Sequence, residues 1–177
     1  LSIIGIKNIT IELSSRIFLD KLFNKIKNKT DISKLYKFIS KKDLNSSLEV
    51  VDVKHRNFIK NIFLCTGSFK KINYKLELLN IDQETSEEIN KIRKIAKKLK
   101  LNHGDKLFID FSELDEKNYH NGVRFTFFAK NVRGEIASGG RYHIKNNNIN
   151  ETATGFTCYM DSIIRASSFE NVSKKIL

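Results

Sequence analysis

The spacing of apolar residues is helical from residue 12 to about residue 101 and changes at about residue 105, and this change constrains the fold most strongly. Before it, apolar residues recur every three or four positions, as at Ile89 and Ile92, which places them on one face of a helix. After it, apolar and polar residues alternate, as at Val123, Phe125 and Phe127, which is typical of a strand with one buried face. The sequence therefore predicts an α+β fold.

Capping residues and glycines divide the helical part into segments. Asp31 is expected to cap a short helix, Thr85-Ser86-Glu87-Glu88 resembles a capping box, and Gly67 is expected to stop a helix. We expect helices over residues 17–26, from Asp31 to residue 39, from Lys42-Asp43 to residue 51, over 55–64 and over 85–101.

The strand-like segments surround this helical part. Strands are expected over residues 3–11, 106–111, 122–128, 135–139 and 152–159, followed by a closing helix over 161–168. The turn Asn131-Val132-Arg133-Gly134 predicts an antiparallel hairpin, and Asn146-Asn147-Asn148 predicts an exposed loop. We expect a sheet core formed by residues 1–12 and 105–177, with residues 13–104 as a helical insertion region.

The charge of the chain is strongly basic, with 32 Lys and Arg against 20 Asp and Glu. A nucleic-acid partner is unlikely in our interpretation, because the lysines are dispersed and no arginine cluster or aromatic stacking motif accompanies them. The alternative that a basic surface binds an acidic protein or a phosphate-rich substrate is left open. We expect no membrane span, since no apolar run reaches about 18 residues. The first residue is Leu1, so we expect an upstream part of a longer protein to be absent.

The two cysteines, Cys65 and Cys158, both lie in apolar runs. One disulfide is possible on count alone, but we expect buried, reduced thiols of a cytoplasmic protein. Neither has zinc-ligand spacing with the four histidines, so we predict no metal site and no cofactor.

Several motifs, in this order, resemble histidyl-tRNA synthetases and their paralogue, the regulatory subunit of short-form ATP phosphoribosyltransferase. The segment from Gly5 to Leu13 resembles the strand after the second class II motif, and Tyr119-His120-Asn121-Gly122 resembles the family's Tyr-Tyr-Thr-Gly. Gly139-Gly140-Arg141-Tyr142 matches Gly-Gly-Arg-Tyr, and the segment from Gly155 to Asp161 resembles the third class II motif. The resemblance implies part of a class II aminoacyl-tRNA synthetase-like antiparallel sheet with a helical insertion.

Two of the departures from the synthetase pattern replace an arginine. Asp115 stands where the synthetases have an arginine that stabilises the adenylation transition state, and Ser162 stands where their third motif has an arginine on ATP. Neither side chain supplies a guanidinium. The resemblance therefore implies a non-catalytic regulatory role in histidine biosynthesis, with a catalytic subunit as partner, L-histidine as effector, and a homo-oligomer formed through the upstream region.

The same resemblance implies part of a histidine pocket. Gly139 and Gly140 would let a ligand approach the strand backbone, while His120 and Tyr142 would face the imidazole. Tyr119 would support the pocket. A strand tyrosine packed in the core is the alternative for Tyr142.

Two further roles concern charged residues of these motifs. Asp115 is a candidate for the ammonium group of the ligand. Arg141 is expected to form an ion pair with Asp110 or Glu135. Two other functions stay open at this point: a divergent histidyl-tRNA synthetase fragment that activates histidine with ATP, and a basic RNA-binding or scaffolding relative.

Overall fold

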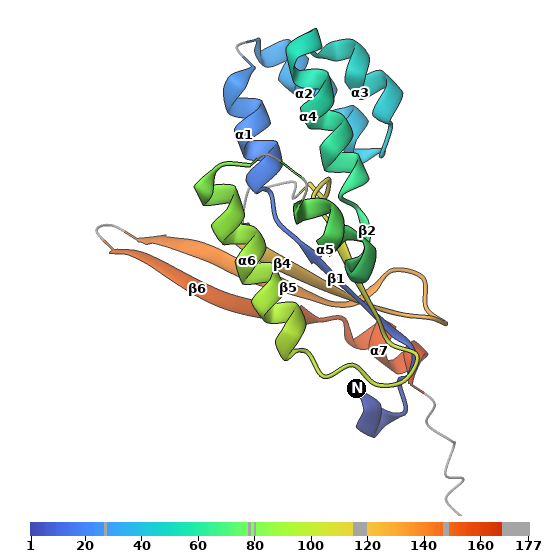
Figure 1. Cartoon of the computed structure of the whole chain (residues 1–177). Helices are drawn as coiled ribbons and strands as arrows, with labels where there is room; N and C mark the ends of the chain where they lie inside the picture. Colours follow the sequence, from blue (N-terminus) through green and yellow to red (C-terminus); the bar gives the residue numbers. More distant parts are fainter. Residues whose placement is uncertain (27, 78, 80, 115–119, 147–148, 168–177) are drawn as a thin grey trace, which may run out of the picture.

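A mixed sheet forms the centre of the molecule. The computed structural model describes residues 1–26, 28–77, 79, 81–114, 120–146 and 149–167. Within these ranges, six strands follow the order β2-β3-β1-β4-β5-β6 (Figure 1). They are β1 (Ile9–Ser14), β2 (Gly67–Ser68), β3 (Lys106–Asp110), β4 (His120–Ala129), β5 (Glu135–Asn146) and β6 (Ile149–Cys158). The predicted α+β class is confirmed.

Strand β1 lies between β3 and β4. It runs antiparallel to β4, with Leu13 opposite Phe125, but parallel to β3, with Leu13 opposite Ile109. The β1–β3 pair is thus an exception within the predicted antiparallel sheet. Parallel neighbours need a crossover connection, because the chain must return to the end where it started. The helical segment between these strands provides that crossover, and its strand β2 also pairs with β3.

Among the described residues, helices α1 to α4 and helix α6 have different positions relative to the sheet. Helices α1 to α4 cluster beyond one end of the sheet, whereas α6 lies across one sheet face (Figure 1). Their bounds are α1 (Ile17–Lys25), α2 (Lys29–Ser40), α3 (Leu44–Val50), α4 (Val53–Leu64), α5 (Phe69–Glu77), α6 (Gln83–Lys98) and α7 (Met160–Ala166). The sequence predicted all of them except α5.

Short polar side chains begin three of the helices. Asp43 accepts a hydrogen bond from the Ser46 backbone N–H, as predicted for the start of α3. The other two caps lie earlier than predicted: Asn28 caps α2 through the Thr30 N–H, and Asp82 caps α6 through the Thr85 N–H. In both helices, the residue that caps the first turn lies three positions before the predicted one.

Element boundaries near two glycines differ from the predicted ones. Gly5 has a φ of 77° and ends a 3-10 turn at Ser2–Ile4, so the first strand starts only at Ile9. Gly67 has a φ of 140° and lies in β2, while α4 ends earlier, at Leu64. A glycine in the left-handed region permits such reversals without a Cβ clash.

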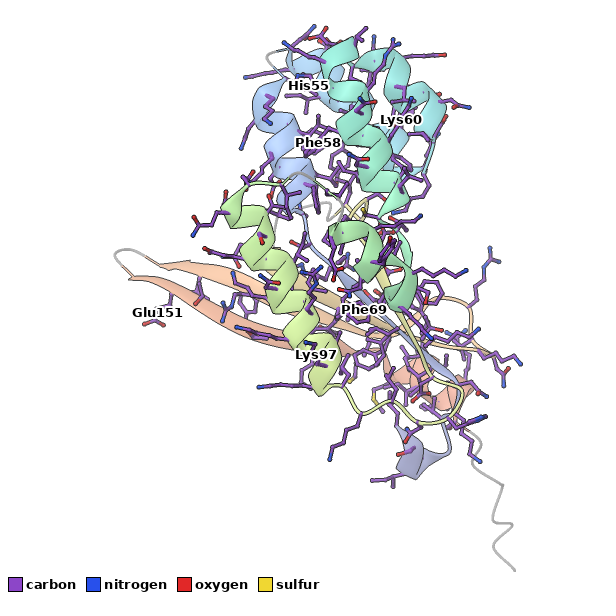
Figure 2. All side chains as sticks on the ribbon, in the orientation of Figure 1. His55, Phe58, Lys60, Phe69, Lys97 and Glu151 are labelled. Carbon is purple, nitrogen blue, oxygen red and sulfur yellow. The ribbon has the colours of Figure 1, made fainter. Side chains whose placement is uncertain are left out.

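One apolar core joins the helical cluster to the sheet. Phe111, directly after β3, is fully buried and its ring centroid lies 4.8 Å from that of Phe18 in α1. Phe18 in turn lies 6.0 Å from Phe58 of α4, which points between the helices (Figure 2). These rings fix α1 and α4 to the end of β3, so the helices have a defined position relative to the sheet.

The two cysteines have different environments. Cys65 is buried, and burial raises the pKa of its thiol to about 11. Cys158 at the end of β6 is exposed, so the expectation of two buried thiols is wrong for Cys158. The predicted loop at residues 146–148 is only partly described: Asn146 belongs to β5, and Asn147 and Asn148 lie outside the described residues. Among the described helices, none has the length and apolarity to cross a bilayer.

Candidate functional site

Two of the predicted pocket residues are cross-strand partners. His120 opens β4 and lies opposite Tyr142 of β5. Directly paired residues of an antiparallel ladder project from the same sheet face. The structure therefore brings the His120 imidazole and the Tyr142 phenol to one face at the start of the β4–β5 ladder.

The glycines beside these rings make room for them. A Cβ on Gly140 would lie 2.7 Å from His120 Cδ2, and a Cβ on Gly155 would lie 3.3 Å from Tyr142 Cε1. The space above Gly140 and Gly155 is thus taken by the protein's own aromatic rings. Gly139 faces the other side of the sheet, where a Cβ would lie 2.7 Å from Phe156 Cα, so Gly139 permits close packing of β5 against β6.

An irregularity in β4 separates His120 from the rest of the strand. Between the pairs His120–Tyr142 and Arg124–Gly140, β4 contains two residues more than β5. A bulge of this kind re-aims side chains at a strand end. His120 consequently borders a polar pocket of about 350 Å³ between the bulge, α1 and the first turns of α6, to which Glu88, Lys91 and Ser15 also contribute.

A cluster of charged side chains lies further along the same face. Glu12, Asp110 and Glu113 bring carboxylate oxygens within 4.8 Å of one another. Lys42, from the turn between α2 and α3, places its Nζ 2.7 Å from Asp110 and 3.4 Å from Glu113. Arg124 lies 3.5 Å from Glu113 on the other side.

This clustering perturbs one of the carboxylates. The pKa of Glu12 is raised to about 7, first by burial and then by the negative charges of Asp110 and Glu113, against the opposing effect of Lys42 and Arg124. Sequence reasoning overlooked this cluster. The available signal was Glu12 itself, a carboxylate in the middle of an apolar strand.

The remaining predicted site residues have different outcomes. Asp115 and Tyr119 lie outside the described residues. Arg141 does not pair with Asp110 or Glu135, because those carboxylates pair with Lys42 and with Arg124, respectively. Arg141 instead projects from the opposite sheet face, beside α6.

Position 162 is also defined by the structure. Ser162 is 9% exposed at the start of α7. Arg165 folds back along its own helix, with Nε 3.2 Å from the Asp161 carbonyl oxygen and an amino group 3.4 Å from Ser162 Oγ.

The fold and these motif positions define a class II synthetase-like domain. The profile of the family described as histidyl-tRNA synthetase matches residues 1–163. The chain belongs to this family.

Curated relatives carry the name ATP phosphoribosyltransferase regulatory subunit. One from Clostridium botulinum (strain Langeland) is 29% identical over 98% of this chain and 45% of its own length. One from Lactococcus lactis is 26% identical over 92% of this chain and 50% of its own length. The chain thus spans about half the length of these relatives.

Solved structures have the same fold at low sequence identity. A Bacillus halodurans protein described as an ATP phosphoribosyltransferase regulatory subunit/histidyl-tRNA synthetase has a TM-score of 0.72 at 16% identity, over 93% of this chain and 46% of that one. Histidyl-tRNA synthetase from Nostoc has a TM-score of 0.70 at 17% identity, over 92% and 42%. The ATP phosphoribosyl transferase (HisG:HisZ) complex from Thermotoga maritima contains a chain with a TM-score of 0.59 at 16% identity, over 85% and 53%.

Proposed function

We propose that the chain is part of a non-catalytic regulatory subunit of ATP phosphoribosyltransferase in histidine biosynthesis. It would bind the catalytic subunit, support its activity and relay inhibition by L-histidine. The curated relatives' shared name supports the partner. The observation that carries the non-catalytic part is the buried Ser162 with Arg165 folded against its own helix, because this arrangement offers no guanidinium to ATP phosphates.

Histidine sensing is assigned to the His120–Tyr142 pair. A neutral imidazole ligand needs one hydrogen-bond acceptor and one donor, and a phenol or an imidazole side chain provides either. The polar pocket of about 350 Å³ beside His120 is also lined by Glu88, which accepts hydrogen bonds from Ser15 Oγ and Lys91 Nζ and would accept one more from the ligand's ammonium group. Asp115 and Tyr119 stay candidates for the same pocket.

The proposal is tested with the complete polypeptide that contains this chain, added to a short-form catalytic subunit. Formation of phosphoribosyl-ATP is measured while L-histidine is titrated. Tyr142→Phe should raise the inhibitory histidine concentration by about tenfold, the effect of one hydrogen bond, without removing the activation. Thr157→Ala, on the same sheet face in β6, is the matched control. Activation and inhibition that are both unchanged in Tyr142→Phe and His120→Ala would refute this pocket.

A divergent synthetase is the second candidate, since structural relatives include a histidyl-tRNA synthetase. Histidine-dependent exchange of pyrophosphate into ATP would establish it. We expect no such exchange, because the cation that would bind ATP at position 162 is replaced by Ser162.

A further inference from the structure

Arg124 of β4 lies on the sheet face that carries His120 and Tyr142. It is opposite Gly140 of β5, two residues before Tyr142. Residues two apart on one strand share a face, so the guanidinium projects on the side of the proposed histidine pocket. Gly140 has no side chain to separate Arg124 from His120: a Cβ there would lie 3.1 Å from Arg124 Cα and 2.7 Å from His120 Cδ2.

The Arg124 guanidinium is largely buried but poorly bonded. Its side chain is 20% exposed, and it lies 3.5 Å from Glu113 and 3.9 Å from Glu135. Charge-assisted hydrogen bonds are ordinarily about 2.7–2.9 Å long, so neither contact is short. The Nε atom is buried and has no hydrogen-bond partner among the described residues. Because a cation removed from water needs hydrogen bonds to offset its lost hydration, Arg124 has unused capacity for an anion.

A small cavity places this unused donor beside the polar pocket. The cavity, of about 10 Å³, is lined by Arg124, Glu113 and His120, and by Arg16 from the start of α1. His120 and Arg16 also line the polar pocket of about 350 Å³, so the two spaces are neighbours. A volume of about 10 Å³ accommodates one water molecule at most. A ligand carboxylate can therefore reach Arg124 only if the Glu113 side chain moves out.

We propose that Arg124 binds the carboxylate group of the amino-acid ligand in exchange for Glu113. The ligand's carboxylate accepts hydrogen bonds from the guanidinium, including Nε, in a bidentate arrangement. Glu113 is 34% exposed and stays with Lys42, whose Nζ lies 3.4 Å from it. Arg124 would thereby select an amino acid over an amine in the histidine pocket of the proposed function, on which this inference rests.

Competition between Glu113 and the ligand gives the exchange a distinctive sign. Both carboxylates bind the same guanidinium, so removal of the Glu113 charge frees Arg124 for the ligand. Glu113→Gln should therefore tighten histidine binding. A purely structural ion pair between Glu113 and Arg124 predicts the opposite, because its loss would leave Arg124 without a fixed position in the pocket wall.

Calorimetry with the complete polypeptide that contains this chain tests the role of Arg124. The two ligands are L-histidine and histamine, which keeps the imidazole and the ammonium group but lacks the carboxylate. We expect Arg124→Gln to reduce the preference for histidine over histamine by about tenfold, the effect of one charge-assisted hydrogen bond. Arg124→Lys should retain part of the preference, because it keeps the charge but not the planar fork. The preference is a ratio measured on one protein, so it does not depend on the folded fraction of the variant.

The second measurement is histidine affinity in Glu113→Gln, which should be about threefold higher than in the wild type, without tighter histamine binding. Glu151→Gln is the matched control, because Glu151 is exposed near the start of β6 (Figure 2) and its loss should change neither affinity. A preference that survives in Arg124→Gln, or histidine affinity that is unchanged or lower in Glu113→Gln, would overturn the role of Arg124 and leave histidine binding in place. Absence of histidine binding to the wild-type polypeptide would overturn the histidine pocket and the role of Arg124 together.

Discussion

The contact between the helical cluster and the sheet depends on Lys42, and its replacement by methionine tests this dependence. Lys42 has a φ of 57° at the turn between α2 and α3, which directs its side chain to the end of β3. There Nζ contacts Asp110, Ser112 and Glu113 at 2.7, 3.0 and 3.4 Å. Lys42→Met removes the only lysine from a group of three carboxylates in the described part of the chain.

The expected loss of stability in Lys42→Met follows from the solvent exposure of Lys42 and Asp110. Breaking a fully buried ion pair costs about 3–5 kcal/mol. The Asp110 side chain is 7% exposed but that of Lys42 is 42% exposed, so solvent screens part of the attraction. Asp110 also keeps hydrogen bonds from the Thr66 hydroxyl and from the Ser112 N–H and hydroxyl. We therefore expect a loss of about 2 kcal/mol in the free energy of unfolding at pH 8.

The loss of unfolding free energy caused by Lys42→Met should be smaller at lower pH. The pKa of Glu12 is raised from 4.5 to about 7 in the folded state, so between these values the folded protein retains a proton that the unfolded chain releases. The stability associated with this group is full below pH 4.5 and is lost as the pH rises through about 7. Lys42 lowers this pKa, and its removal makes the charged form of Glu12 more costly. At pH 5.5 the loss should fall to about 1 kcal/mol.

Urea unfolding followed by circular dichroism at both pH values measures these losses. Lys60→Met is the matched control, because Lys60 is exposed on α4 and carries the same charge (Figure 2). Glu12→Gln should remove the extra loss at pH 8. Equal destabilisation by Lys42→Met and Lys60→Met, or a Lys42→Met loss that is larger at pH 5.5, would refute this reasoning.

Three further predictions concern packing and thiols. Gly140→Ala places a Cβ 2.7 Å from His120 Cδ2 and should destabilise by about 2 kcal/mol in thermal unfolding, more than Gly155→Ala, where the nearest contact is 3.3 Å. Phe111→Ala opens a cavity at the joint with α1 and should cost about 3–5 kcal/mol in urea. Dithionitrobenzoate should titrate Cys158 in the native chain and Cys65 only after denaturation; fast native reaction of Cys65 would contradict its burial.

The sequence predicted the fold well where its periodicity was strong. The stripe of α6 and the alternation in β4 identified both elements, because burial of one face imposes a period on apolar residues. Helix α5 was overlooked because its apolar stripe, with Ile72 and Leu76 buried, is short and lacks a predicted cap. The local sequence pattern also did not predict that β1 and β3 are parallel, because their relative direction depends on the long crossover between them.

The ligand-binding role of the candidate site stays a prediction, whereas the placement of its residues can be compared with the structure. The motif resemblance selected His120 and Tyr142, and the structure places them opposite each other. The reason given for Gly140, close approach of a ligand, did not anticipate that the His120 ring lies over it. The ion-pair partner of Arg141 was mistaken because a side chain's sheet face cannot be known before the register and the bulge in β4 are fixed.

The most direct test of the regulatory assignment is calorimetric titration of L-histidine, and then of ATP, into the complete polypeptide that contains this chain. The account predicts that histidine binds, that ATP does not, and that no pyrophosphate exchange occurs. Binding of both ligands with histidine-dependent exchange would contradict the account and identify an active synthetase.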